Sequence, residues 1–116
     1  MRSQLTLGFL TMLSVSGNSM AADLAVGKKI FEQSCAYCHK TGYDEKFGPG
    51  LAGISERRDA EWLDKFLTNP AEMIKTDEYA QTLRESNKYG LTMPALPEMQ
   101  DANKRRDVIE YLKTIQ

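Results

Sequence analysis

The chain has 116 residues, with 15 lysines and arginines against 16 aspartates and glutamates, so its formal net charge is −1. This balance excludes a polybasic nucleic-acid-binding protein, and it also excludes an acidic tail. We therefore expect no nucleic-acid partner. The length allows one folded domain.

Residues 1–21 have the pattern of a secretory signal peptide. Arg2 supplies the positive charge, residues 5–15 are mainly apolar, and Ser19 and Ala21 place small residues at the cleavage positions. The apolar stretch is too short to span a bilayer comfortably, and no other segment approaches the ~20 residues that a spanning helix needs. We expect export by the general secretory route, cleavage near Ala21, a mature domain over 22–116 without a transmembrane segment, and a periplasmic location. An uncleaved N-terminal anchor is the alternative.

A first helix is predicted over residues 23–38, because apolar or small residues recur there at helical spacing. They are Leu24, Gly27, Ile30, Phe31 and Cys38. This helix ends at the most informative motif of the chain.

Residues 35–39 read C-A-Y-C-H and contain both cysteines and the single histidine of the chain. This spacing is typical of covalent attachment of a c-type haem. Three residues of helix separate Cys35 from Cys38, a rise of about 4.5 Å, so each sulfur can bond to one vinyl group on the same porphyrin edge. His39 follows directly, where its imidazole can bind the iron. A redox-active dithiol is the alternative, whereas a structural zinc site needs four ligands and this motif offers three.

A loop and a second helix come next. The loop is predicted from a cluster of glycines with one proline, namely Gly42, Gly48, Pro49, Gly50 and Gly53. Asp59 is a suitable N-cap for the second helix, and Pro70 lies shortly past its end. The apolar side of this helix holds Trp62, Leu63, Phe66 and Leu67.

The rest of the chain reads as two further helices. Residues 76–87 form a third predicted helix, and Pro94 and Pro97 break the chain after it. Asp101 or Asn103 caps a last helix. Its buried stripe consists of Val108, Ile109, Tyr111, Leu112 and Ile115. No segment shows strand alternation, so the predicted fold class is all-α.

Taken in order, these motifs resemble the class I c-type cytochromes, the small soluble electron carriers with one haem. The resemblance covers essentially the whole mature sequence. It is carried by Gly27-Lys28-Lys29-Ile30-Phe31, the C-A-Y-C-H motif, Gly48-Pro49-Gly50-Leu51, Phe66-Leu67-Thr68-Asn69-Pro70, Met93-Pro94 and Val108-Ile109-Glu110-Tyr111-Leu112-Lys113. It implies a cytochrome c fold, with three to five helices wrapped around one covalently attached haem c.

The resemblance also implies a function. The protein would be a monomer without enzymatic activity that shuttles single electrons between a redox-protein donor and a redox-protein acceptor. Two other classes stay open. One is a haem enzyme or gas-binding sensor with a vacant sixth position on the iron. The other is a dedicated haem subunit bound to a periplasmic dehydrogenase or oxidase.

Particular site residues follow from the resemblance. Cys35 and Cys38 would anchor the haem, and His39 and Met93 would bind its iron. The carbonyl of Pro49 would accept a hydrogen bond from the His39 ring, which fixes the tautomer and makes the ligand more basic. A thioether opposite an imidazole raises the haem potential.

Met93 is not the only candidate for the second iron ligand. Met73 lies just past Pro70, where packing at a helix end is the simpler role, and Met99 suits a core gap. Met93 precedes a proline, which favours extended backbone, and the pair resembles the Met-Pro ligand loop of the family.

The chain departs from the smallest members of this family between Pro70 and Met93. Residues 71–92 exceed a minimal loop, and we expect them to cover the haem edge or to form a docking surface. Two further sets have open interpretations. Arg57, Arg58 and Trp62 either donate to a haem propionate or form a solvated arginine pair beside a core tryptophan. Lys28, Lys29, Lys40 and Lys46 either form a positive rim beside the haem edge or are simply solvated.

Overall fold

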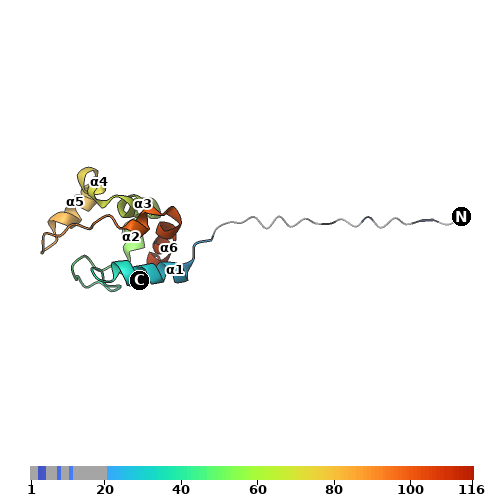
Figure 1. Ribbon diagram of the computed structural model, residues 1–116, viewed down its shortest axis with the longest axis horizontal. Coiled ribbons are helices and arrows are strands. Elements are labelled where there is room, and N and C mark those ends of the chain that lie inside the picture. Colours follow the sequence, from blue (N-terminus) through green and yellow to red (C-terminus); the bar gives the residue numbers. More distant parts are fainter. Residues whose placement is uncertain (1–2, 5–7, 9–10, 12–20) are drawn as a thin grey trace.

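The computed structural model describes residues 3, 4, 8, 11 and 21–116. In this part of the chain there are six α-helices, a π-helical turn and a 3₁₀ turn, and there are no strands (Figure 1). The all-α prediction is confirmed, with one helix more than the upper end of the expected range. The predicted signal peptide lies almost entirely outside the described residues. No helix within them has both the length and the apolar character needed to cross a membrane.

The segment predicted as one helix over 23–38 is helical but not uniform. Helix α1 covers Leu24–Ile30, and a π-helical turn, η1, covers Phe31–Cys35. Asp23 caps α1 by accepting the N–H of Val26 at 3.1 Å. In η1 the N–H of Ala36 donates to the carbonyl of Phe31 at 2.9 Å, one residue beyond the α-helical partner. Apolar spacing alone does not reveal such a turn, and π-turns often occur at functional sites.

Helix α1 crosses the last helix, α6, which covers Ala102–Leu112 (Figure 1). Gly27 makes this approach feasible, because a Cβ there would clash with the carbonyl oxygen of Asp107. The rings of Phe31 and Tyr111 pack beside the crossing, with centroids 5.4 Å apart. Asp101 caps α6 by accepting the N–H of Asn103 at 2.9 Å, so the first of the two predicted caps is the one used.

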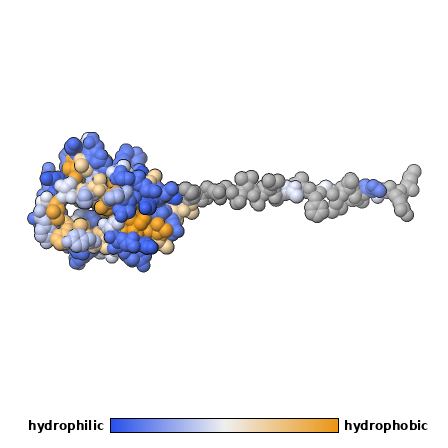
Figure 2. Space-filling model, in the orientation of Figure 1, coloured by the Kyte–Doolittle hydropathy of each residue, from blue (hydrophilic) through white to orange (hydrophobic). Residues whose placement is uncertain are grey.

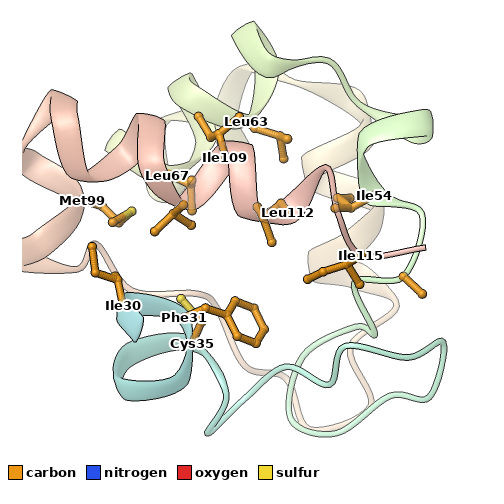
Figure 3. Close-up of a cluster of buried hydrophobic side chains, with 12 residues drawn as sticks. Ile30, Phe31, Cys35, Ile54, Leu63, Leu67, Met99, Ile109, Leu112 and Ile115 are labelled. Atoms are coloured by element: carbon orange, nitrogen blue, oxygen red, sulfur yellow. The ribbon is translucent and has the colours of Figure 1, made fainter. Parts of the chain in front are cut away.

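Two helices and a short turn complete the wall opposite α1. They are α2 at Ile54–Arg57, α3 at Ala60–Thr68 and the 3₁₀ turn η2 at Pro97–Gln100. Asp59 caps α3 as predicted, accepting the N–H of Trp62 at 2.8 Å. The apolar faces of these elements and of α6 bury one core (Figure 3). Its members are Ile30, Phe31, Cys35, Ala52, Ile54, Leu63, Leu67, Met99, Val108, Ile109, Leu112 and Ile115.

The region after α3 contains a helix that sequence analysis missed. Helix α4 covers Pro70–Thr76 and α5 covers Glu78–Glu85. Pro70 opens α4 rather than ending the helical region, because a proline in the first turn has no N–H to leave unpaired. Asn69 caps α4 by accepting the N–H of Glu72 at 3.2 Å. The helix predicted over 76–87 therefore exists as the shorter α5.

Candidate haem-binding site

A cavity of about 480 Å³ lies between the elements, and its lining is mostly apolar. Leu63 and Leu67 of α3 and Val108 and Leu112 of α6 form one side of it. The motif at residues 35–39 and the loop that follows form a second side. The face of the folded part shown in Figure 2 is mainly hydrophilic, with smaller hydrophobic patches between. A cavity of this kind is typical of a cofactor site.

The imidazole of His39 is held from two directions. Its Nδ1 donates to the carbonyl oxygen of Pro49 at 2.8 Å, as the resemblance implies. A Cβ at Gly48 would lie 2.6 Å from Cε1 of the ring, so only glycine leaves room for it there. Burial lowers the pKa of His39 below its ordinary value, against the opposing effect of the bond to Pro49. The ring is therefore neutral at pH 7, with Nε2 carrying the lone pair that a metal needs.

The backbone turn at the motif brings both cysteines to the cavity. The carbonyl of Cys35 accepts the N–H of Cys38 at 3.1 Å and that of His39 at 3.0 Å. Cys35 is buried, Cys38 is half-buried, and they are not joined by a disulfide. Burial is the main cause that raises the pKa of the Cys35 thiol to about 11, with smaller contributions from Glu98 and Cys38.

This thiol environment bears on the alternatives to haem. Redox-active cysteines have lowered pKa values, because the thiolate is the reactive form, whereas the pKa of Cys35 is raised. Cys35 is therefore in the thiol form at neutral pH. Within residues 21–116 and the four described positions before them, no group of three or more His, Cys, Asp or Glu side chains is arranged to hold a metal ion.

The methionines separate clearly. Met93 is half-buried and lines the same cavity as His39. Met99 is 1% exposed and packs in the core instead (Figure 3). Met73, in α4, does not line the cavity either. Among the methionines of the described residues, Met93 alone lines the cavity.

Residues 71–92 wall the cavity rather than extend away from it. Ile74 of α4 and Tyr79, Ala80 and Leu83 of α5 line it. Ala80 is only 1% exposed. This placement is compatible with the expected covering of the haem edge, and the docking role stays a prediction.

Arg58 and Trp62 present buried donors beside α5. The guanidinium of Arg58 lies 3.7 Å from the ring centroid of Tyr79 and 5.8 Å from that of Trp62. Together with the larger effect of the Ala80 N–H, Trp62 and Arg58 lower the pKa of Asp77. Nε of Arg58 makes no hydrogen bond in the described part of the chain, and Arg58 does not line the cavity. Trp62 and Arg57 do line it, so these two members of the set can face a group held there.

Arg57 has a different role from its neighbour. Its Nη1 donates to the carbonyl of Ala52 at 2.7 Å, which ties α2 to the preceding loop. Sequence analysis treated Arg57 and Arg58 alike, and the structure distinguishes them.

Sequence analysis missed one cavity residue with several contacts. Asn87 lines the cavity and hydrogen-bonds to the loop that holds His39. The run Asn87-Lys88-Tyr89-Gly90 carries the residues typical of a turn, and that signal was available in the sequence.

Comparisons with known proteins agree with this geometry. The family profile of cytochrome c matches residues 24–116. The cytochrome c-553-like protein of Synechocystis sp. is 31% identical over 77 residues, which make up 56% of this chain and 73% of that protein. The structure of cytochrome c from Rhodothermus marinus has the same fold, with a TM-score of 0.71 at 23% identity, covering 97% of this chain and 85% of that one. The cytochrome c domain of the pp3183 protein from Pseudomonas putida matches with a TM-score of 0.62 at 32% identity, covering 75% of this chain and 84% of that one.

Proposed function

Because the chain belongs to the cytochrome c family, whose members bind haem c covalently and carry electrons, we propose that it is a periplasmic one-electron carrier with His39 and Met93 as iron ligands. One observation carries this proposal. Cys35, Cys38, His39 and Met93 all line one mostly apolar cavity. The haem, when bound there, takes up and releases one electron at its iron.

The His39 side of the site is preorganised. The bond from Nδ1 to the Pro49 carbonyl holds the ring and assigns the proton to Nδ1, which leaves Nε2 for the iron. Gly48 keeps the space that the ring occupies. A histidine ring that is held in place would lower the reorganisation energy of electron transfer, because it would not rotate when the iron changes its charge.

Met93 would supply a soft sulfur ligand, which favours ferrous iron and raises the potential. With His39 and Met93 both bound to the iron, no coordination position would be left for a substrate. We therefore propose a carrier rather than an enzyme or a gas sensor.

Cys35 and Cys38 would form the two thioether bonds. Their separation across a single turn keeps both sulfurs at the same side of the cavity. Arg57 and Trp62, which line the cavity, would direct N–H donors to a propionate.

The periplasmic part of the proposal rests on the signal-peptide pattern of residues 1–21. Partners are then redox proteins in the same compartment, one that donates an electron and one that accepts it. Transient redox encounters of this kind use small interfaces, below about 1,200 Å².

The test is expression with a periplasmic haem-attachment system. We expect the purified protein to keep its colour on a denaturing gel and to have the mass of residues 22–116 plus one haem. The ferric protein should show the charge-transfer band of a sulfur–iron bond, and Met93→Ala should abolish it while Met99→Ala retains it. A colourless chain with free thiols contradicts the haem proposal, and the reverse pattern of the two variants contradicts the ligand assignment.

A further inference from the structure

The side chain of Asn87 makes three hydrogen bonds. Its Nδ2 donates to the carbonyl oxygen of Phe47 at 2.8 Å. Its Oδ1 accepts the N–H of Tyr89 at 3.0 Å and the N–H of Leu91 at 3.1 Å. One amide group therefore holds its own turn and a segment forty positions away in the chain.

The two segments joined in this way each lie next to one of the proposed iron ligands in the sequence. Phe47 directly precedes Gly48 and Pro49, which hold the His39 ring. Leu91 lies two residues before Met93. Between residues 36–53 and residues 71–96, all described, the bond from Asn87 to Phe47 is the one hydrogen bond that connects them.

The turn after Asn87 restricts how far the following segment, with Met93, can move. Gly90 has φ +64°, a left-handed conformation that glycine adopts readily. Its N–H donates to the carbonyl of Asn87 at 3.1 Å. From the anchored Leu91, two residues of extended chain span at most about 7 Å. Fixing the turn therefore limits where the sulfur of Met93 can lie.

Aromatic rings also pack between the Phe47 segment and the turn that follows Asn87. The rings of Phe47 and Tyr89 have centroids 5.7 Å apart, and Tyr37 stacks on Phe47 at 5.5 Å. Tyr37 and Tyr89 are 75% and 54% exposed, so this contact is solvated on its outer side. The half-buried amide of Asn87 supplies the hydrogen bonds of this contact, which depend on direction in a way that ring packing does not.

We infer that Asn87 is a positioning residue for the Met93 ligand, which it sets by tying the ligand segment to the loop that holds His39. This inference rests on the proposed ligation by Met93. Asn87 would not touch the iron. It would lower the fraction of time in which the Met93 segment moves away and exposes the iron to other ligands.

The experiment measures the affinity of the ferric holoprotein for imidazole, which binds only after Met93 leaves. Three variants are compared with the unchanged protein: Asn87→Ala, Asn87→Asp and the exposed control Asn103→Ala. Asn87→Asp keeps an oxygen for Tyr89 and Leu91 but loses the donor to Phe47. The free energy of unfolding in denaturant is measured alongside, as is the sulfur–iron band without imidazole.

Loss of a partly buried hydrogen-bond set of this size should raise imidazole affinity by about 10- to 100-fold in Asn87→Ala. Asn87→Asp should raise it by about tenfold, and Asn103→Ala should leave it unchanged. The increase in imidazole affinity should be larger than the measured loss in free energy of unfolding would produce by itself.

Three outcomes overturn the inference. Equal affinity in all four proteins means that Asn87 does not position Met93. A rise in Asn87→Ala alone means that the turn, and not the link to Phe47, sets the ligand. Absence of the sulfur–iron band from the unchanged protein means that the proposed ligand set is itself wrong, and this failure is visible before any variant is compared.

Discussion

His39 and Pro49 are joined by a hydrogen bond of 2.8 Å from the ring Nδ1 to the carbonyl oxygen, and the residue before Pro49 lies against the same ring. The bond controls which nitrogen carries the proton. The absence of a side chain at Gly48 controls where the ring plane can lie. The loop after the C-A-Y-C-H motif thus determines both the chemistry and the orientation of the histidine.

Gly48→Ala should displace the His39 ring, because the new Cβ would lie 2.6 Å from Cε1 and 2.9 Å from Nδ1. We expect a loss of stability of about 1–3 kcal/mol, together with a changed reduction potential. Gly42→Ala is the matched control, since no atom lies within 4 Å of a Cβ there. Denaturant unfolding and potentiometric titration of both holoproteins check the prediction. Equal behaviour of the two variants would refute it.

Substitutions of Met99 and Met93 should have different effects, the first on stability and the second on iron ligation. Met99 is 1% exposed in the core, so Met99→Ala should cost about 2–5 kcal/mol in free energy of unfolding and keep the sulfur–iron band. Met93→Ala should abolish the band and lower the reduction potential. Spectra and denaturant unfolding of the two variants measure both effects. A large loss of stability without loss of the band in Met93→Ala would contradict the assignment.

The cap of α6 should make stability depend on acid pH. The N–H of Lys104 is the main cause that lowers the pKa of Asp101 below its ordinary value of 3.8, with a smaller effect of the Asn103 N–H. Because the folded-state pKa is depressed, the stabilisation is fully present above pH 3.8 and is lost as the pH falls through the folded-state value. Asp101→Asn should therefore flatten the dependence of the melting temperature on pH below pH 4. Asp44→Asn, in an exposed loop, is the control, and an unchanged acid dependence in Asp101→Asn would count against the cap.

The lysines near the motif should affect partner association unequally. Lys28 lies 4.0 Å from Glu32, which offsets its charge. Lys46 lies 5.7 Å from the ring centroid of Tyr37, a residue that lines the cavity. Lys46→Glu should therefore slow the bimolecular electron-transfer rate with an acidic redox partner, most strongly at low salt.

Stopped-flow rates at several ionic strengths measure this effect. Lys113→Glu is the control, because Glu110 lies 2.6 Å from Lys113 and already offsets its charge. Rates that depend neither on salt nor on Lys46 would indicate a preassembled complex, in which the protein is a bound subunit rather than a diffusing carrier.

Much of the fold was predictable because its signals are local. Asp59 and Asp101 are caps that a reader of the sequence can place, and the apolar stripe of α6 marks its buried side. Pro70 lies just past the end of α3 as predicted, but the helix that it opens was missed, since a proline after a helix marks either an end or the first turn of another helix. The choice depends on Asn69, whose cap becomes evident only from its bond to Glu72. The π-turn before Cys35 leaves no trace in apolar spacing.

The candidate site, like the fold, could be predicted from the sequence only in part. Cys35, Cys38 and His39 are adjacent in sequence, so their spacing alone indicates their chemistry. The Met93-Pro94 pair favoured Met93 over Met99, and the structure has Met93 lining the cavity and Met99 in the core. The turn at Asn87-Lys88-Tyr89-Gly90 could have been predicted, but the bond from Asn87 to Phe47 could not, because side-chain links between remote residues have no sequence signature.

The size of the cavity has a consequence for how the protein comes into being. Residues from the first helical segment to α6 line its 480 Å³. Without a group in it, this mostly apolar lining is left to water, which removes part of the hydrophobic stabilisation that a filled core provides. Covalent attachment should therefore stabilise the fold as well as supply the redox centre.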